Sequence, residues 1–221
     1  MSLIVLEGLD GSGKDTQAGL LGQALEKELG QVCKVTFPDY GSPSSALVKM
    51  YLHGDFGTQP GDVNAYAASA FYAVDRFASF KRGWGGAYRQ GVPVLADRYA
   101  TSNLIYQLAK LPQPEWEGYI AWAEDFEYGK LGLPRPDRVI YLDMPIEVSQ
   151  QLLAQRYKQG GHKDIHESHL GFLQACRESA AFVAQRQGWA VVPCGDSTGP
   201  FPRDEIHRQV LGKALEVLAP S

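Results

Sequence analysis

Short apolar runs alternate along this chain with longer segments in which apolar residues recur at helical spacing. Such short runs are typical of strands that are buried on both faces of a parallel sheet. We therefore expect five strands, at residues 3–6, 32–37, 92–96, 139–142 and 189–192.

The segments between these runs predict helices. Helical spacing and stop signals such as Gly30 place them near residues 14–29, 44–53, 63–82, 103–110, 115–128, 145–157, 167–186 and 203–218. Residues 54–62 are rich in glycine and proline and predict a loop. Strands that alternate with helices imply a three-layer α/β fold, with a five-stranded parallel sheet flanked by helices. No repeat or linker divides residues 1–221, so we expect a single domain.

Composition and charge exclude several classes of protein. The chain has 221 residues, 44% of them hydrophobic, which is enough to bury one large core. It contains no apolar run of membrane-spanning length, and its start lacks the pattern of a secretory signal. The net charge of −4 argues against an extended nucleic-acid interface. Its three cysteines are far apart and odd in number, which favours reduced thiols in a cytoplasmic protein.

The segment LIVLEGLDGSGKDT at residues 3–16 carries the strongest chemical signal. A buried strand leads into a turn with three glycines, and Lys14 opens the next helix. Glycines let backbone N–H groups point into one concavity, and the helix start adds more, so the pattern predicts a phosphate-binding P-loop. The candidate nucleotide-binding residues are Gly8, Asp10, Gly11, Ser12, Gly13, Lys14, Asp15 and Thr16. The alternative, a turn that only joins strand to helix, requires neither Lys14 nor a third glycine.

Two carboxylates are candidate ligands of Mg²⁺. Asp15 stands where a P-loop usually has a serine or threonine for this ion. Its carboxylate could ligate Mg²⁺ directly or through water, or its negative charge could repel the triphosphate. Asp97 ends the apolar strand at 92–96, where a carboxylate can hold Mg²⁺ through water. Asp143 ends the next strand in the same way and is the rival to Asp97, but no arginine adjoins it.

Other polar residues follow the strand ends or share a helix face. Arg98 suits a second anion, since its guanidinium matches phosphate oxygens, although an ion pair with Asp97 is the structural alternative. Tyr72 and Arg76 are four residues apart on one helix face, where they could stack on a flat base and bond its edge. Spacing alone favours a plainer interpretation, an aromatic ring in the core beside an arginine that reaches the surface.

The polar, glycine-containing residues 156–166 are a candidate lid. Their cations are Arg156, Lys158 and Lys163. A lid that closes positive charge over phosphates and an ordinary solvated loop both explain them. The spacing of His162, His166 and His169 superficially suggests a metal site, but the first lies in the expected loop and no cysteine joins them.

Several of these motifs together resemble one family. The blocks GLDGSGKDTQ, FPDY, FYAVDRF, DRYATSNLIYQ, GLPRPDRVIYLD and KDIHE occur in the order found in thymidylate kinases, which are P-loop nucleoside monophosphate kinases. They run from residue 8 to residue 167. The resemblance implies a P-loop NTPase fold, transfer of the γ-phosphoryl group of ATP to dTMP with Mg²⁺, and a homodimer.

The resemblance also implies roles for the matching residues. Asp10 corresponds to an acidic residue near the 3′-hydroxyl, Tyr72 to a ring that stacks on thymine, and Arg76 to an arginine at its O4 edge. The P-loop of this chain has no arginine, unlike that of some members of the family. The resemblance implies that the cations of the lid supply that positive charge instead. The implied substrate-binding residues are Asp10, Phe37, Tyr40, Tyr72, Arg76, Arg98, Asn103, Tyr106 and Gln107. The implied catalytic residues are Lys14, Arg98, Arg156, Lys163 and Asp10.

Three other functions are alternatives at this point. The nearest is another P-loop deoxynucleotide or deoxynucleoside kinase, and a deoxynucleoside kinase would not need a second phosphate-binding residue such as Arg98. A GTP-dependent switch is disfavoured because the chain has no Asn-Lys-x-Asp run. A nucleotide sensor without catalysis is favoured only by Asp15.

Overall fold

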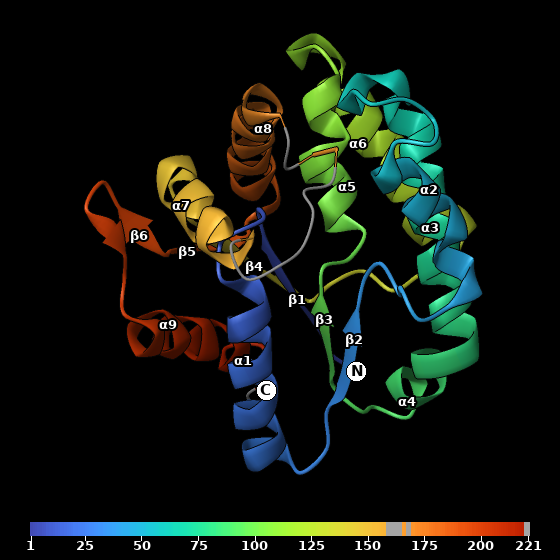
Figure 1. Cartoon of the computed structure of the whole chain (residues 1–221). Coiled ribbons are helices and arrows are strands. Elements are labelled where there is room, and N and C mark those ends of the chain that lie inside the picture. Colours follow the sequence, from blue (N-terminus) through green and yellow to red (C-terminus); the bar gives the residue numbers. More distant parts are fainter. Residues whose placement is uncertain (158–164, 167–168, 219–221) are drawn as a thin grey trace.

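The fold is that of a computed structural model, which describes residues 1–157, 165–166 and 169–218, and for Arg156 the backbone alone. In this part of the chain, five parallel strands form one sheet between layers of helices (Figure 1). They are β1 (Leu3–Gly8), β2 (Cys33–Thr36), β3 (Val94–Asp97), β4 (Arg138–Asp143) and β5 (Ala190–Pro193). Their order in the sheet is β2-β3-β1-β4-β5. The predicted three-layer α/β fold is confirmed.

β1 is the central strand and is buried on both faces. Leu3 and Val5 belong to the apolar core on one face, whereas Ile4 and Leu6 belong to the core on the other. Successive side chains of a strand point to opposite faces, so an uninterrupted apolar run contributes to both cores. Because β1 pairs with both β3 and β4, its carboxyl end at Gly8 lies between the ends of those strands.

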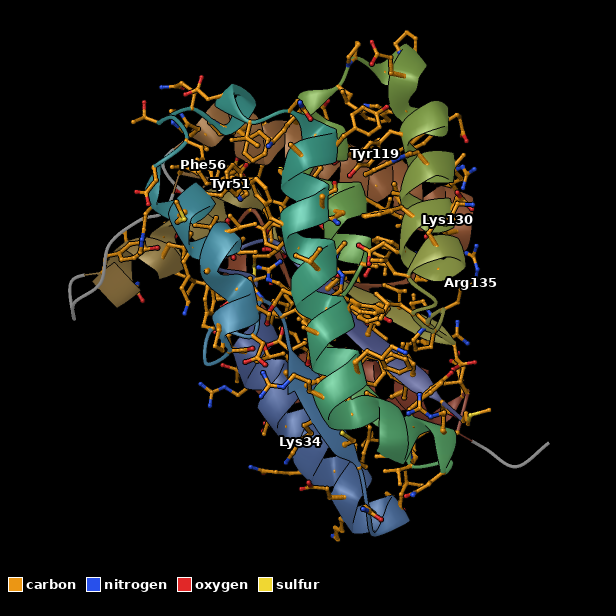
Figure 2. All side chains as sticks on the ribbon, turned by 90° about the vertical axis from the view of Figure 1, so that its right-hand side faces the viewer. Lys34, Tyr51, Phe56, Tyr119, Lys130 and Arg135 are labelled. Atoms are coloured by element: carbon orange, nitrogen blue, oxygen red, sulfur yellow. The ribbon has the colours of Figure 1, made fainter. Side chains whose placement is uncertain are left out.

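Different helices cover the two faces of the sheet (Figure 1). The core of Ile4 and Leu6 is covered by α1 (Lys14–Leu29), α7 (Ile146–Tyr157) and α9 (Arg203–Leu215). The core of Leu3 and Val5 is covered by α5 (Thr101–Tyr106), α6 (Trp116–Glu124) and α8 (Leu170–Gln187). At the edge of this second layer, two helices lie side by side on the face that Figure 2 turns toward the viewer, α2 (Ala46–His53) and α3 (Ala65–Ser79).

Short segments join these elements. The 3₁₀ turns are η1 (Pro43–Ser45), η2 (Pro60–Asp62), η4 (Leu108–Lys110) and η5 (Gln113–Glu115). A small antiparallel hairpin, β6 (Gly195–Asp196) with β7 (Gly199–Pro200), follows β5. The sequence analysis missed this hairpin because two-residue strands are too short to show any periodicity.

The long helix expected to end before Gly83 continues further. α3 runs into a π-helical turn, η3 (Phe80–Trp84), and then into α4 (Gly85–Arg89). The rings of Phe80 and Trp84 are buried with centroids 4.6 Å apart. Their burial outweighs the cost of about 1 kcal/mol that a glycine carries inside a helix. The helix expected near 115–128 likewise ends in a π-helical turn, η6 (Asp125–Lys130).

Two observations bear on the class of protein. Within the described residues, no helix has the length and the apolar composition that crossing a membrane requires. Cys33, Cys176 and Cys194 are free thiols, in agreement with the expectation from their spacing.

Candidate functional site

The loop between β1 and α1 has the backbone geometry of a phosphate-binding loop. Gly11 and Gly13 have φ angles of +81° and +82°, in the left-handed region that favours glycine. A Cβ atom at Gly11 would also lie 2.6 Å from the carbonyl oxygen of Ser149, so the loop passes α7 only without a side chain. α1 begins at Lys14, so the N–H groups of its first turn directly follow the loop.

Lys14 lies in this loop with its ammonium group between two carboxylates. Its Nζ atom donates to Asp97 at the end of β3 and lies 3.2 Å from Oδ1 of Asp15. The Lys14 side chain is 7% exposed, whereas that of Asp15 is 81% exposed. The structure therefore brings both predicted Mg²⁺ ligands together around Lys14.

The hydroxyl groups of the loop differ in their surroundings. The Ser12 hydroxyl is buried and has no hydrogen-bond partner within the described residues, whereas Thr16 is exposed. A buried hydroxyl without a partner destabilises the protein, and a ligand that bonds to it removes that cost. Ser12 is thus suited to contact a nucleotide phosphate.

Arg98 follows β3 in a conformation that is rare for a residue other than glycine, with a φ angle of +65°. Its Nη2 atom donates to Oδ1 of Asp10 at 2.6 Å. Its Nη1 atom donates to the carbonyl oxygen of Gly8 at 3.1 Å and to the Tyr106 hydroxyl at 3.2 Å. Among the described residues, the alternative ion pair with Asp97 does not form, because Asp97 binds Lys14 and Arg98 binds Asp10.

The groups around Arg98 keep its guanidinium charged. Burial alone would lower the pKa of Arg98, but interactions with Tyr106, Asp10, Glu7 and Asp97 raise it well above its usual value. Burial raises the pKa of Tyr106, so its hydroxyl stays protonated and donates to Oδ2 of Asp10 at 3.1 Å. A fixed positive charge therefore lies beside the P-loop, where it can bind a second phosphate group.

Glu7 was not predicted as a site residue, yet it holds the turn that follows Arg98. It is fully buried in β1. Its carboxylate accepts hydrogen bonds from the backbone N–H of Tyr99 at 3.2 Å, from the Thr101 hydroxyl at 2.7 Å and from the Ser102 hydroxyl at 2.9 Å. Burial raises the pKa of Glu7, and Arg98 acts in the opposite direction. The sequence did carry a signal, because a glutamate in an apolar central strand requires buried partners.

A cavity opens beside Arg98 at this edge of the sheet. All the residues that the resemblance assigns to the acceptor line it, namely Asp10, Phe37, Tyr40, Tyr72, Arg76, Arg98, Asn103, Tyr106 and Gln107. Oε1 of Gln107 is buried without a hydrogen-bond partner in the described part of the chain, so a polar atom of a ligand can satisfy it. The structure thus brings the predicted residues together, although they come from five separate stretches of the sequence.

A buried ion pair contradicts one part of the plainer interpretation of Tyr72 and Arg76, the arginine that reaches the surface. Arg76 is 1% exposed, which excludes an arginine that reaches the surface. Its Nε atom donates to Oε2 of Glu127 at 3.1 Å, and its Nη2 atom donates to Oε1. Tyr72 lines the same cavity from one turn earlier on α3. The sequence analysis missed Glu127 because it lies in η6, which periodicity assigns to the end of an ordinary helix.

Asp75 holds the loop that carries Phe37 and Tyr40, and the sequence analysis missed it too. Its carboxylate accepts hydrogen bonds from the backbone N–H of Asp39 at 2.8 Å and from the Ser44 hydroxyl at 2.5 Å. Asp75 is buried on α3, directly before Arg76. One turn of α3 therefore positions two parts of the cavity lining. Asp75 holds the loop that carries Phe37 and Tyr40, and Arg76 lines the cavity itself.

Asp143, the rival Mg²⁺ ligand, is bound elsewhere. Arg177 on α8 donates from Nε and Nη2 to the two carboxylate oxygens of Asp143, at 3.0 and 3.2 Å. Asp97, and not Asp143, lies beside Lys14. The sequence did not indicate this partner because Arg177 lies 34 residues further along the chain.

His166 is a cavity residue that the sequence analysis placed in the candidate lid, in the block KDIHE and in the spacing of three histidines. Its ring stacks on that of Tyr106 with centroids 5.4 Å apart and an interplanar angle of 15°. The Tyr51 hydroxyl lies 2.8 Å from Nε2 of His166 and accepts a hydrogen bond from Nζ of Lys110 at 2.8 Å. The Tyr51 hydroxyl and Nε2 of His166 thus share one hydrogen bond, and the tautomer of the His166 ring determines which of the two donates. Tyr51 and Phe56 mark this region in Figure 2.

Protonation of His166 is expected to destabilise the fold. Burial, with Lys110 and Arg98 acting in the same direction, lowers the pKa of His166 from 6.5 to about 3, although Asp10 opposes the shift. The unfolded chain therefore binds a proton that the folded chain does not, and stability falls as the pH falls from 6.5 toward 3. At pH 5 the loss from this residue is about 2 kcal/mol. Urea unfolding at a series of pH values measures it.

His166→Phe keeps an aromatic ring beside Tyr106 and removes the titrating group. Its free energy of unfolding should fall less than that of the wild type between pH 7.5 and 5. Parallel curves for the two proteins would show that His166 does not cause the acid sensitivity.

The proposed lid falls largely outside the described residues. Lys158, His162 and Lys163 lie outside them, and so does the side chain of Arg156. The structure therefore does not test the catalytic roles predicted for Arg156 and Lys163, nor the site of three histidines. Across the residues it does describe, no group of three or more histidine, cysteine, aspartate or glutamate side chains is arranged to hold a metal ion.

A glycine-rich loop with Lys14 at the start of α1, and the guanidinium of Arg98 beside it at the carboxyl edge of a parallel sheet, are typical of a P-loop nucleotide kinase. Residues 6–199 match the family model described as thymidylate kinase. The chain therefore belongs to the thymidylate kinase family.

Individual relatives agree with this assignment. The chain is 33% identical over 190 residues to the thymidylate kinase of Mycobacterium tuberculosis (strain CDC 1551 / Oshkosh), covering 85% of this chain and 87% of the relative. It is 30% identical over 192 residues to a probable thymidylate kinase of Pyrobaculum aerophilum, covering 87% and 88%. It is 32% identical over 181 residues to the thymidylate kinase of Akkermansia muciniphila, covering 82% and 78%.

Proposed function

We propose that this chain transfers the γ-phosphoryl group of ATP to the 5′-phosphate of dTMP, giving dTDP and ADP. The observation that carries the proposal is the pairing of two anion sites at one sheet edge, the loop around Lys14 and the guanidinium of Arg98. The cavity beyond Arg98 ends in polar side chains suited to a base, so the second anion is the phosphate of a nucleotide. The family assignment identifies that base as thymine.

The acceptor residues divide by the part of dTMP that they would contact. Tyr72 offers a ring for stacking on the base, and Arg76 a donor for its O4 atom. Tyr106 and Asp10, which are hydrogen-bonded to each other and to Arg98, line the cavity and suit the sugar. Crowding by the Tyr106 ring disfavours a 2′-hydroxyl group. Arg98 would bind the phosphate.

Catalysis by this site relies on positioning and charge. The phosphate of dTMP is already an anion near neutral pH, so no strong general base is required. Lys14 would neutralise charge on the β- and γ-phosphates, while Arg98 holds the attacking oxygen in line. We propose that Arg156 and Lys163 add positive charge from the lid.

The residues present fit Mg²⁺. Asp97 and Asp15 offer carboxylate oxygens, the ligands that this ion prefers, and both already bind the ammonium cation of Lys14. We propose that these two aspartates hold the ion directly or through water. The ion would supply charge neutralisation on the phosphate oxygens.

A substrate panel tests the proposed activity. With ATP as donor, dTMP should be phosphorylated faster than dUMP and much faster than dCMP, dGMP or thymidine. ADP release with each acceptor is the measurement. Preferred phosphorylation of thymidine would favour a deoxynucleoside kinase, and no turnover with any acceptor would favour a nucleotide sensor.

Arg76→Ala should raise the KM for dTMP about 100-fold and change the KM for ATP less than threefold, because Arg76 lines the cavity proposed for the acceptor. It should also lower the free energy of unfolding by about 3–5 kcal/mol, since Glu127 is left buried without its partner. Arg82→Ala, which removes an exposed arginine from η3, is the control. An equal loss for both nucleotides would contradict the proposed base site.

We also propose that the protein acts in the cytoplasm as a single-domain protomer of a homodimer. Its free thiols support the location. Exposed apolar side chains on α2 and α3, namely Leu47, Met50, Tyr66 and Val74, support an interface that involves these two helices. The sedimentation velocity of the purified protein measures the oligomeric state.

A further inference from the structure

Glu127 lies behind the base end of the acceptor cavity. It belongs to η6, is 2% exposed and is not among the residues that line the cavity. By contrast, Lys130, the last residue of η6, and Arg135 have exposed side chains, and both are labelled in Figure 2. Glu127 is therefore a buried carboxylate that no ligand in the cavity needs to touch.

The carboxylate binds two of the cavity's polar side chains at once. In the described part of the chain it accepts hydrogen bonds from Nε and Nη2 of Arg76 and from Nδ2 of Asn103, the last at 3.2 Å. A carboxylate accepts hydrogen bonds but donates none, so every neighbour must present a donor to it. Glu127 thus sets the orientation of both side chains.

The orientation of Asn103 follows from this rule. Its amide nitrogen faces Oε1 of Glu127 and the backbone carbonyl oxygen of Ser69, at 3.2 and 3.4 Å. Both partners are acceptors, so a flipped amide would set oxygen against oxygen. The remaining polar atom of Asn103 is Oδ1, an acceptor, and the nitrogen of Arg76 that Glu127 does not use is Nη1, a donor.

A donor and an acceptor at this end of the cavity match one class of base. Thymine and uracil present an acceptor at O4 and a donor at N3, whereas cytosine presents a donor at N4 and an acceptor at N3. We propose that Glu127 is a positioning residue that makes the acceptor site select thymine or uracil over cytosine, by fixing the Asn103 amide and the Arg76 guanidinium. The inference rests on the proposed function, which it deepens by naming what sets the choice of base.

Glu127→Gln tests the inference, because a glutamine has one acceptor and one donor where the glutamate has two acceptors. In either orientation the new NH₂ group opposes a donor of Arg76, at Nε or at Nη2. Where it replaces Oε1 it opposes Nδ2 of Asn103 as well, and a flip of the Asn103 amide relieves that second conflict. The ratio of kcat/KM for dTMP to that for dCMP should fall at least about tenfold, mainly through the KM for dTMP. The KM for ATP should stay within about twofold of the wild-type value.

Glu124→Gln is the matched control, since it makes the same exchange one turn earlier, on a side chain that pairs with the exposed Arg135. Its base selectivity should equal that of the wild type. Circular dichroism shows whether each variant folds. If Glu127→Gln does not fold, Glu127→Asp replaces it, and the withdrawn carboxylate should lower the selectivity ratio at least about threefold.

The outcomes separate the two proposals. A wild-type protein that phosphorylates dTMP, together with a folded Glu127 variant of unchanged selectivity, overturns the inference alone. A wild-type protein without activity toward dTMP overturns the proposed function, and the inference with it. A selectivity loss in Glu124→Gln equal to that in the Glu127 variant also overturns the inference.

Discussion

Lys14→Ala is expected to lower kcat for dTMP phosphorylation by at least about 10³-fold and to leave the fold unchanged. The Lys14 ammonium group lies in the P-loop beside Asp97 and Asp15, so its removal takes away positive charge that would neutralise the β- and γ-phosphates as the bond to the leaving oxygen breaks. Steady-state kinetics with ATP and dTMP measure the loss, and circular dichroism tests the fold.

Lys34→Ala is the matched control for this variant. Lys34 on β2 is about half exposed and pairs with Glu26 at 2.9 Å, away from the P-loop. Its removal should change kcat by less than about twofold. Near-normal turnover of Lys14→Ala would rule out the assignment of this loop as the donor site.

Arg98→Ala is expected to lower kcat/KM for dTMP about 10³-fold, with little change in the KM for ATP. The guanidinium offers planar, charge-assisted hydrogen bonds that match a phosphate, and the nearby acidic groups keep it ionised. The loss should appear in kcat as well as in KM, since an acceptor phosphate that is not held in line reacts slowly.

Arg177→Ala is the corresponding control. It removes another paired arginine, whose partner is Asp143 at the end of β4. Activity should stay within about threefold of the wild-type value. If Arg177→Ala and Arg98→Ala had equal effects, Arg98 would lose its proposed role at the acceptor phosphate, and Asp143 would become a candidate for the site again.

Local patterns predicted most of the fold. The apolar runs predicted all five strands of the main sheet, and the glycines before Lys14 predicted the loop that joins β1 to α1. These features depend on neighbouring residues, so sequence spacing is enough to find them. The rule that ligands bind at the carboxyl ends of parallel strands then pointed to Asp97 and Arg98.

Buried polar partners were harder to predict. Glu7, Asp75 and Glu127 each bind groups far away in the sequence, and the spacing of residues in one chain does not reveal such pairs. The π-helical turn after α3 was missed because burial of Phe80 and Trp84 outweighed the glycines nearby. Tertiary contacts, and not local propensity, determine these features.

The buried carboxylate of Glu7 has a consequence for how the two nucleotides are aligned. β1 ends at Gly8, where the P-loop begins. Glu7 on the same strand accepts hydrogen bonds from Tyr99 and Thr101, which follow Arg98. The proposed donor and acceptor sites are thus built on one strand, so we expect the distance between the two reacting phosphates to be largely preorganised before either substrate binds. Closure of a lid would then need only to exclude solvent and add charge.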